Sequence, residues 1–243
     1  MADPLMVSAG AGPARVSLIL PTYNERETLP RLIAALRPMA PRLGLEIVVV
    51  DDASPDGTAD VAAALAAEGG VPIRLVRRLG KAGLASAVLA GAVVASAPII
   101  AVMDSDGSHP PEVLPALVAA VEGGADLAVA SRYVAGGRIE QWPAWRRLAS
   151  RVATTGARTF LRLRVRDPLS GYFALRREIL ARGEYWGVGF KILLEILART
   201  PQLHVVEVGY RFTDRAAGRS KLSPREITAY LRLLGRLLVD RGS

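Results

Sequence analysis

The sequence predicts an α/β fold in which helices cover both faces of a mostly parallel sheet. Five short runs of apolar or β-branched residues alternate with segments long enough for a helix, which is the pattern of such folds. The runs are rich in Val, Ile and Leu, as strands buried on both faces are. Polar residues follow directly after the runs, and ligands bind beyond the carboxyl ends of the strands in this class of sheet.

In order along the chain, the predicted strands are residues 16–20, 46–50, 73–76, 99–103 and 126–130. The 22 residues from 82 to 103 carry no charge and are long enough to span a bilayer. We reject a membrane span because the segment is mostly Ala, Gly and Ser and is divided by Pro98. A helix followed by a buried strand explains it better. Beyond residue 130 the alternation stops, apart from an apolar run at 205–208 and a helix expected at about 224–239.

The length and composition suit one folded domain. With 243 residues, 51% of them hydrophobic and 22% charged, the chain can bury one substantial core. We assign residues 15–243 to this domain and residues 1–14, rich in Ala, Gly and Pro, to a flexible leader without the pattern of a signal peptide. The absence of cysteine excludes disulfides and thiolate sites, and it favours a cytoplasmic location.

An acidic pair follows the fourth predicted strand. Asp104 and Asp106 lie in the run Met-Asp-Ser-Asp-Gly-Ser-His, where two carboxylates can face one ligand. Two anions this close repel each other unless a cation lies beside them. Mg²⁺ and Mn²⁺ bind one or two carboxylates and fill their other positions with water and phosphate oxygens. A capped turn is the alternative interpretation.

A second acidic pair, Asp51 and Asp52, follows the second strand and could accept hydrogen bonds from a nucleotide base or ribose. No strand is followed by a glycine-rich phosphate loop, which argues against a dinucleotide-dependent dehydrogenase and a P-loop kinase. Phosphate binding must then come from a metal and basic side chains. The candidates are Lys81, Arg132, Arg215 and Lys221.

Six motifs now occur in a characteristic order. They are Pro-Thr-Tyr-Asn-Glu at 21–25, Val-Asp-Asp-Ala-Ser-Pro-Asp at 50–56, Asp-Ser-Asp at 104–106 with His-Pro-Pro at 109–111, Ser-Arg-Tyr at 131–133, Asp-Pro-Leu-Ser-Gly at 167–171, and Arg-Ala-Ala-Gly-Arg-Ser-Lys at 215–221. Together they resemble family 2 glycosyltransferases, which have the Rossmann-like GT-A fold, and among these the polyprenol-phosphate (dolichol-phosphate) mannose synthases. The resemblance covers residues 15–225, and residues 189–197 also resemble the archaeal and bacterial branch.

This resemblance implies an enzyme that moves mannose from GDP-mannose to a polyprenyl monophosphate, with Mg²⁺ or Mn²⁺, at the cytoplasmic face of a membrane. The implied donor-binding residues are Pro21, Tyr23, Glu25, Val50, Asp52, Asp104, Ser105, Asp106, Ser108, Arg132, Arg215 and Lys221. Of these, Asp104, Asp106, Arg132, Arg215 and Lys221 would be catalytic. Asp106 and Ser108 would hold the metal, although the family often has Gln in place of Ser108. Arg132, Arg146 and Ser150 would hold the acceptor phosphate.

The implied chemistry needs no general base. A phosphate monoester has a second pKa near ~6 and is largely dianionic at neutral pH. The reaction instead requires a metal on the leaving diphosphate and arginines that hold two repelling anions in line. A single in-line displacement inverts the anomeric centre and gives a β-linked product. His109 is therefore expected to be a structural turn residue.

A basic segment at residues 135–165 is expected to lie on a membrane surface. From Arg132 to Arg166 the chain has nine arginines and one glutamate. Trp145, Leu148, Val152, Gly156, Phe160 and Leu163 recur at helical spacing, with Arg147, Arg151, Arg158 and Arg162 on roughly the opposite side. Trp142 and Trp145 suit a lipid headgroup layer. A surface helix packed on the core is the alternative.

Three other functions remain open from the sequence. A polyprenyl-phosphate glucose synthase would use UDP-glucose at the same site. A non-catalytic basic module would bind a membrane or nucleic acid, but acidic strand ends repel nucleic acid, so we expect no nucleic-acid partner. A sugar nucleotidyltransferase would need a glycine-rich first loop, which is missing. A membrane-spanning protein is a further expected partner.

Overall fold

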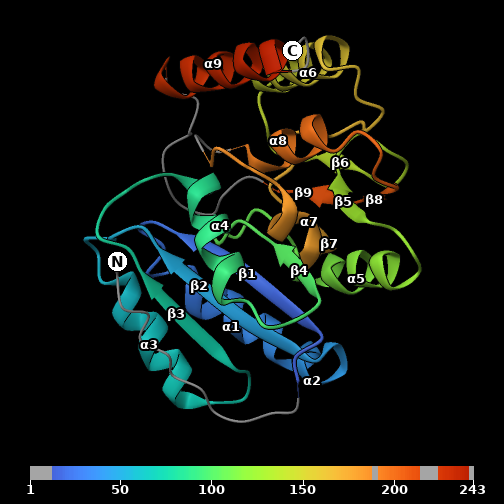
Figure 1. Ribbon diagram of the computed structural model, residues 1–243. Coiled ribbons are helices and arrows are strands. Elements are labelled where there is room, and N and C mark those ends of the chain that lie inside the picture. The colour runs from blue at the N-terminus through green and yellow to red at the C-terminus, as the bar shows by residue number, and fades with distance from the viewer. Residues whose placement is uncertain (1–12, 188–190, 214–223, 241–243) are drawn as a thin grey trace.

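The protein is described by a computed structural model that covers residues 13–187, 191–213 and 224–240 (Figure 1). Its main sheet has seven strands in the order β3-β2-β1-β4-β7-β5-β8. These strands are β1 (Val16–Thr22), β2 (Leu45–Asp51), β3 (Ile73–Arg77), β4 (Ile99–Val102), β5 (Leu127–Ser131), β7 (Phe173–Arg176) and β8 (Val205–Gly209). The five predicted strands are confirmed, and the apolar run at 205–208 is β8.

Parallel pairing brings the carboxyl ends of most strands to one edge of the sheet. Strand β1 pairs in parallel with β2 and β4, β2 with β3, and β5 with β8. Strand β7 is antiparallel to both β4 and β5, so β4 and β5 run in the same direction. The segments that follow β1, β2, β3, β4, β5 and β8 therefore meet at this carboxyl edge.

The sequence pattern does not predict β7. This strand has only four residues, of which three are buried, and a helix begins at the next residue. Its antiparallel direction places its amino end, rather than its carboxyl end, at the carboxyl edge. Residues 170–172 therefore reach the edge from a strand that runs the opposite way.

Helices cover both faces of the sheet, as predicted. One face packs against α1 (Leu29–Leu36), α2 (Ala40–Leu43), α3 (Thr58–Glu68) and α5 (Leu114–Glu122). The other packs against α4 (Leu84–Val94), α7 (Arg177–Arg182) and α8 (Ile192–Arg199). Two short 3₁₀ turns, η1 (Arg37–Met39) and η2 (Pro111–Val113), adjoin α1 and α5. The rejected membrane span is helix α4 followed by strand β4, and within the described ranges no helix has both the length and the apolar character needed to cross a bilayer.

Two long helices form a separate layer at one end of the molecule (Figure 1). Helices α6 (Ala144–Phe160) and α9 (Pro224–Asp240) lie side by side, and Ala157 of α6 shares a buried cluster with Leu233, Leu234 and Leu237 of α9. A two-stranded sheet, β6 (Arg138–Ile139) with β9 (Arg211–Phe212), connects this layer to the main sheet. The helix expected at about 224–239 is thus confirmed as α9, and the helical spacing from Trp145 onward corresponds to α6, which ends at Phe160.

Candidate active site

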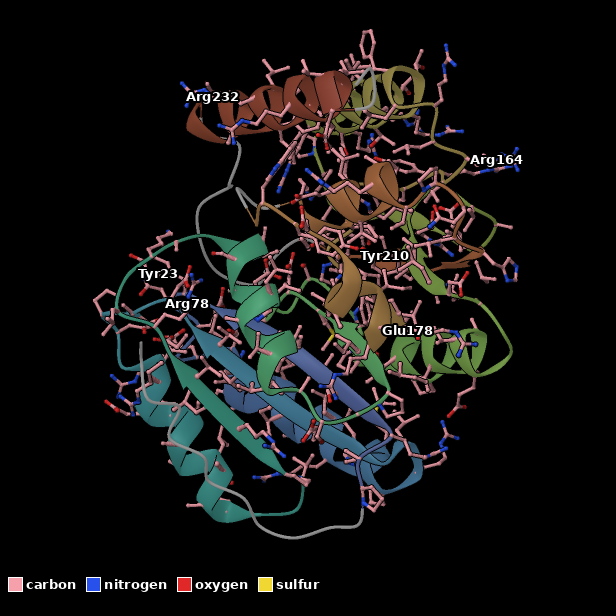
Figure 2. The ribbon with its side chains drawn as sticks, in the orientation of Figure 1. Tyr23, Arg78, Arg164, Glu178, Tyr210 and Arg232 are labelled. Carbon is pink, nitrogen blue, oxygen red and sulfur yellow. The ribbon has the colours of Figure 1, made fainter. Side chains whose placement is uncertain are left out.

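The ends of β1, β2 and β3 form the first part of the site. Figure 2 labels Tyr23 and Arg78 at this edge. The Asp52 carboxylate accepts hydrogen bonds from Arg78 Nη1 at 2.5 Å and from the backbone N–H of Gly83 at 2.9 Å. Lys81 Nζ lies 3.6 Å from the centre of the Tyr23 ring. A carboxylate accepts about four hydrogen bonds, so Asp52 retains capacity for a ligand hydroxyl or amine.

Hydrogen bonds between loops hold this part of the edge in shape. Asp51, the last residue of β2, accepts hydrogen bonds from Thr22 Oγ1 at 3.2 Å and Ser54 Oγ at 2.5 Å. The backbone N–H of Glu25 donates to Thr58 Oγ1, and its carboxylate accepts from Thr28 Oγ1 at 2.6 Å. Asp51 therefore has a structural role, whereas Asp52 remains a candidate ligand contact.

The acidic turn after β4 is buried and attached to β1. Ser105 Oγ donates to the backbone oxygen of Pro21 at 2.7 Å. Asp106 Oδ1 accepts hydrogen bonds from the N–H of Ser108 at 3.1 Å and from its hydroxyl at 2.5 Å. The capped turn is therefore present, and it fixes the carboxylate that the sequence predicts as a metal ligand.

The donor atoms of this turn suit a hard divalent cation. Carboxylate oxygens of Asp104 and Asp106 and the hydroxyl oxygen of Ser108 are the ligand types that Mg²⁺ and Mn²⁺ prefer. The part of the chain that the structure describes has no group of three or more His, Asp or Glu side chains arranged for a metal. Water and diphosphate oxygens would have to complete the coordination, as is usual for Mg²⁺ with nucleotide substrates.

Asp104 packs against Gly171, which comes from the segment before β7. A Cβ atom built on Gly171 would approach Asp104 Oδ2 to 2.6 Å, closer than such contacts ever are. The same oxygen, Asp104 Oδ2, is 3.5 Å from Nε2 of His109, a residue that is only 3% exposed. Because any larger residue at position 171 would clash with it, the Asp104 carboxylate can occupy this position only beside a glycine. The sequence gives no local signal for the contact, because the two residues lie far apart in the chain.

Arg132 forms a buried ion pair with Asp167. Its Nε and Nη2 atoms each donate to a different carboxylate oxygen at 2.7 Å, and its backbone N–H donates to Oδ2 at 3.0 Å. The two side chains are 8% and 0% exposed. Burial alone would lower the pKa of the Arg132 guanidinium, but the charge and hydrogen bonds of Asp167 outweigh it and raise that pKa above its ordinary value. Arg132 therefore orders the segment after β5 in addition to any contact with phosphate.

Five aromatic rings fill the space between these charged groups. His109 lies 5.4 Å from Tyr172, 5.6 Å from Tyr210 and 5.6 Å from Phe212, and Phe212 lies 5.1 Å from Trp142. Figure 2 places Tyr210 between the sheet and the layer of α6 and α9. Burial, together with the charges of Asp167 and Asp104, raises the pKa of the Tyr210 hydroxyl even though Arg132 lowers it. Tyr210 thus stays neutral between the donor turn and the ion pair.

The predicted acceptor residues lie at the start of α6. Arg146 Cζ is 4.1 Å from the centre of the Trp142 ring, and Ser150 Oγ is 2.9 Å from the hydroxyl of Tyr133. Trp142 therefore contacts Arg146 and Phe212. The expectation that Trp142 lies in a lipid headgroup layer does not anticipate these contacts within the protein. Arg215 and Lys221, the two remaining predicted phosphate ligands, lie outside the described residues.

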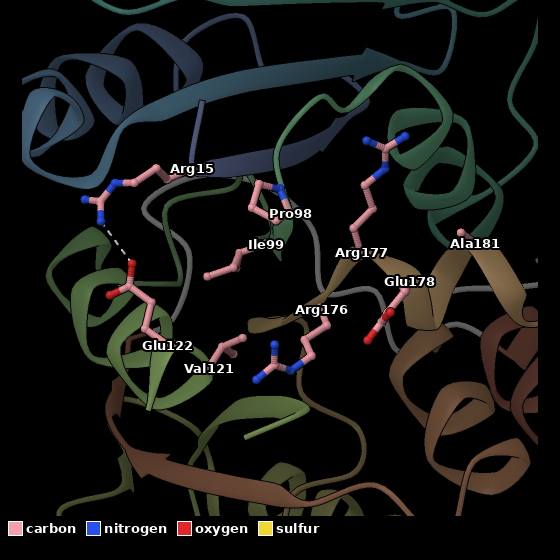
Figure 3. A pocket seen from close by; sticks show the side chains of 9 residues that line it. All are labelled: Arg15, Pro98, Ile99, Val121, Glu122, Arg176, Arg177, Glu178 and Ala181. Carbon is pink, nitrogen blue, oxygen red and sulfur yellow. Dashed lines mark hydrogen bonds and ion pairs between the residues drawn. The ribbon is translucent and has the colours of Figure 1, made fainter. Parts of the chain in front are cut away.

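The cavity in Figure 3 lies away from these residues. It has a volume of about 720 Å³ and is lined at the start of β4 by Pro98 and Ile99, and by charged side chains that include Arg15, Glu122 and Arg177. Arg15 Nη1 and Glu122 Oε1 are 3.1 Å apart there. No predicted site residue lines this cavity, so we place the candidate active site at the carboxyl edge.

Comparison with known proteins identifies the family of the chain. Residues 17–183 match glycosyl transferase family 2. The chain is 46% identical over 94% of its length to a dolichol-phosphate mannosyltransferase of Pyrococcus furiosus and spans 65% of that protein's length. It is 42% identical over 90% of its length to a polyprenol monophosphomannose synthase of Mycolicibacterium smegmatis, and spans 87% of that protein.

Solved structures show the same fold. Glucosyl-3-phosphoglycerate synthase from Mycobacterium tuberculosis, in complex with Mn²⁺, UDP-glucose and phosphoglyceric acid, matches with a TM-score of 0.69 and 23% identity over 95% of this chain and 80% of the other. At this identity the match supports the GT-A architecture alone. Since these relatives match nearly the whole chain and the family match covers residues 17–183, the chain belongs to glycosyl transferase family 2 and, within it, to the dolichol- and polyprenol-phosphate mannosyltransferases.

Proposed function

We propose that the chain moves mannose from GDP-mannose to a polyprenyl monophosphate, with inversion, at the cytoplasmic face of a membrane. The observation that carries this proposal is the position of the acidic turn. Ser105 connects it to Pro21 at the end of β1, on the side of the predicted nucleotide residues. His109 and Asp104 connect it to the aromatic rings that lead to Arg146, on the side of the predicted acceptor residues.

The donor side suits a nucleotide. Tyr23 offers a ring for a base, and Asp52 offers carboxylate oxygens for base or ribose donors. Asp104, beside Gly171 and His109, is the carboxylate that we assign to the sugar end of the diphosphate. Relatives named as mannosyltransferases support mannose as the sugar. Guanine is the donor base that the family resemblance implies.

The acceptor side suits a phosphate dianion. Arg146 and Ser150 lie one helical turn apart on α6, where a guanidinium and a hydroxyl can both donate to phosphate oxygens. Because the acceptor is already charged at neutral pH, the chain need only orient it and offset its charge. A bound Mg²⁺ or Mn²⁺, held by Asp106 and Ser108, would stabilise the leaving diphosphate.

The layer of α6 and α9 suits a lipid surface. The helix α6 packs inward through Ala153, Thr154 and Ala157, not through the apolar stripe that the sequence predicts. In that stripe Trp145, Leu148, Val152 and Phe160 are each more than half exposed, as are Leu231 and Val239 of α9. Exposed apolar side chains beside arginines are typical of helices that lie in a membrane interface. This layer supports a membrane-bound acceptor.

The decisive experiment is transfer of radiolabelled mannose from GDP-mannose to a short polyprenyl phosphate, with UDP-glucose tested in parallel. We expect transfer from GDP-mannose that requires Mg²⁺ or Mn²⁺ and is stopped by a chelator. Asp106→Asn should lower kcat by about 100- to 1000-fold, because it weakens stabilisation of the leaving diphosphate.

A matched control is Asp60→Asn on α3, where the side chain is 77% exposed and pairs only with Arg77 among the described contacts. It should change kcat by less than about twofold. Transfer from UDP-glucose alone would select the glucose synthase instead. No transfer from either donor would refute the proposed function.

A further inference from the structure

Three aromatic rings in successive edge-to-face contact lie between the donor carboxylate and the acceptor arginine. We call His109, Phe212 and Trp142 the aromatic bridge. Asp104 Oδ2 is 3.5 Å from His109 Nε2, the His109 and Phe212 rings are 5.6 Å apart at 76°, and the Phe212 and Trp142 rings are 5.1 Å apart at 72°. Arg146 Cζ then lies 4.1 Å from the Trp142 ring. Both ring pairs have the edge-to-face geometry that aromatic side chains prefer.

The backbone holds the rings of the bridge in register. Phe212 lies in β9, which pairs with β6. The N–H of Glu140 donates to the backbone oxygen of Phe212 at 2.8 Å, two residues before Trp142. Arg132 Cζ lies 5.6 Å from the Phe212 ring and 5.9 Å from the Trp142 ring. The buried ion pair therefore supports the bridge from the side.

His109 is placed to orient Asp104. Its ring is enclosed by Tyr172 and Tyr210, both almost fully buried. Within the described part of the chain its Nδ1 atom has no hydrogen-bond partner, so the polar contact of the imidazole is the one that Nε2 makes with the carboxylate. Because packed interiors are not easily deformed, a His109 ring held this closely restricts the position of the Asp104 carboxylate that it contacts.

We propose that His109 and Trp142 are positioning residues, which set the spacing between Asp104 and Arg146 and hence between the donor diphosphate and the acceptor phosphate. The inference rests on the proposed function, because it assigns those two substrates to the two ends of the bridge. Neither residue needs to touch a reacting atom. They affect the alignment of the acceptor phosphate with the donor, and a small displacement of either substrate lowers the rate of transfer strongly.

The first test separates rate from binding. Trp142→Leu removes the ring beneath Arg146 and should raise the KM for polyprenyl phosphate about tenfold, while the KM for GDP-mannose changes by less than about twofold. Trp142→Phe should recover part of this loss. His109→Phe keeps a ring but removes Nε2, and should lower kcat about tenfold. His109→Gln, which restores a side-chain N–H, should recover part of that rate.

The matched control is Trp186→Leu. Arg199 Cζ lies 4.1 Å from the Trp186 ring, so the variant removes an equivalent cation–π contact from a pair that lies outside the bridge. It should change neither KM nor kcat by more than about twofold. A double-mutant cycle compares kcat/KM for polyprenyl phosphate. The fold-loss in the double variant His109→Phe with Trp142→Leu should be smaller than the product of the two single fold-losses, because both variants disrupt the same bridge.

A spectroscopic readout is independent of turnover. The chain has only two histidines, so His204→Gln leaves the imidazole NMR signals of His109 alone. Adding a short polyprenyl phosphate should shift these signals in this background and leave them unmoved when Trp142→Leu is added.

Two results together would refute the proposal. The fold-losses of the two single variants would multiply in the double variant, and the His109 signals would still shift on addition of polyprenyl phosphate in the Trp142→Leu variant. Failure of the proposed function has a different signature. The chain would then transfer no sugar from either donor, and the NMR experiment would still decide whether the two ends are coupled.

Discussion

Strand β2 of the sheet and helix α8, which packs on the sheet, hold buried charge differently, as two glutamates show. Glu46 on β2 accepts hydrogen bonds from Ser17, from Ser96 and from Arg74 Nε at 3.1 Å. Glu195 on α8 is fully buried, but one of its oxygens accepts from the N–H of Trp186 and the other, Oε2, has no hydrogen-bond partner among the described residues. Three side chains donate to the carboxylate on the strand, whereas the one on α8 has the backbone hydrogen bond and an ion pair with Arg199 Nε at 3.5 Å.

The difference is visible in the pKa of each carboxyl group. Burial would raise the pKa of Glu46, but the hydrogen bonds from Ser17 and Ser96 and the charge of Arg74 outweigh it, and that pKa falls below its usual range. For Glu195 burial prevails over Trp186 and Arg199, and the pKa is raised. The carboxyl group on the strand is thus stabilised in its charged form, and the one on α8 in its neutral form.

The largest effect is expected at the ion pair beside the sheet. Arg132→Met leaves the fully buried Asp167 carboxylate without its partner and should lower the free energy of unfolding by about 3–5 kcal/mol. Arg132→Met with Asp167→Asn should recover part of this loss, because the uncompensated charge is removed. Urea unfolding monitored by circular dichroism measures both values.

The control for this prediction is the exposed pair of Arg77 and Asp60, whose side chains are 45% and 77% exposed. Arg77→Met should cost no more than about 1 kcal/mol. Equal losses at the two pairs would show that the buried pair does not hold the segment after β5.

A smaller effect, of opposite pH dependence, is expected at the two glutamates. Glu46 has a lowered pKa, so its stabilisation is present above about pH 4.5 and is lost as the pH falls through its folded-state pKa. Glu46→Gln should therefore cost about 1–3 kcal/mol at pH 7, and less in acid.

Glu195 has a raised pKa, so the stabilisation from its protonated form is present below about pH 4.5 and is lost as the pH rises through its folded-state pKa. Glu195→Gln should thus become less destabilising, relative to the unchanged protein, as the pH rises. Unfolding free energies measured from about pH 2 to pH 8 test both signs. Parallel pH profiles for the two variants would contradict the comparison.

The smallest effect on folding, and the largest on membrane binding, is expected on the exposed side of α6. Arg147→Glu with Arg151→Glu should change the free energy of unfolding by less than about 0.5 kcal/mol, because both side chains are exposed. Each arginine near an anionic surface contributes about 1 kcal/mol, so flotation with anionic vesicles should fall sharply.

Arg31→Glu with Arg42→Glu, on α1 and α2, makes the same change in net charge at exposed positions on a different face. This control should float like the unchanged chain. Equal loss in both variants would mean that net charge, rather than the layer of α6 and α9, directs binding.

Much of the fold and part of the site follow from local sequence. The parallel strands are predictable because buried runs of Val, Ile and Leu alternate with helical segments. The acidic turn and the α6 helix are predictable because their spacing lies within a few residues. The roles assigned to Asp104, Asp106 and Ser108 in catalysis and metal binding stay predictions.

Tertiary packing decided the rest, because it depends on residues that are distant in the chain. Strand β7 enters between β4 and β5 and brings Gly171 against Asp104. The pairing of Arg132 with Asp167 takes a predicted phosphate ligand into the interior. The periodicity of α6 shows that it is amphipathic, but only contact with α9 determines that its apolar stripe faces outward. Which side of a segment is buried depends on the neighbouring layers in the folded protein, and the sequence of one segment does not determine it.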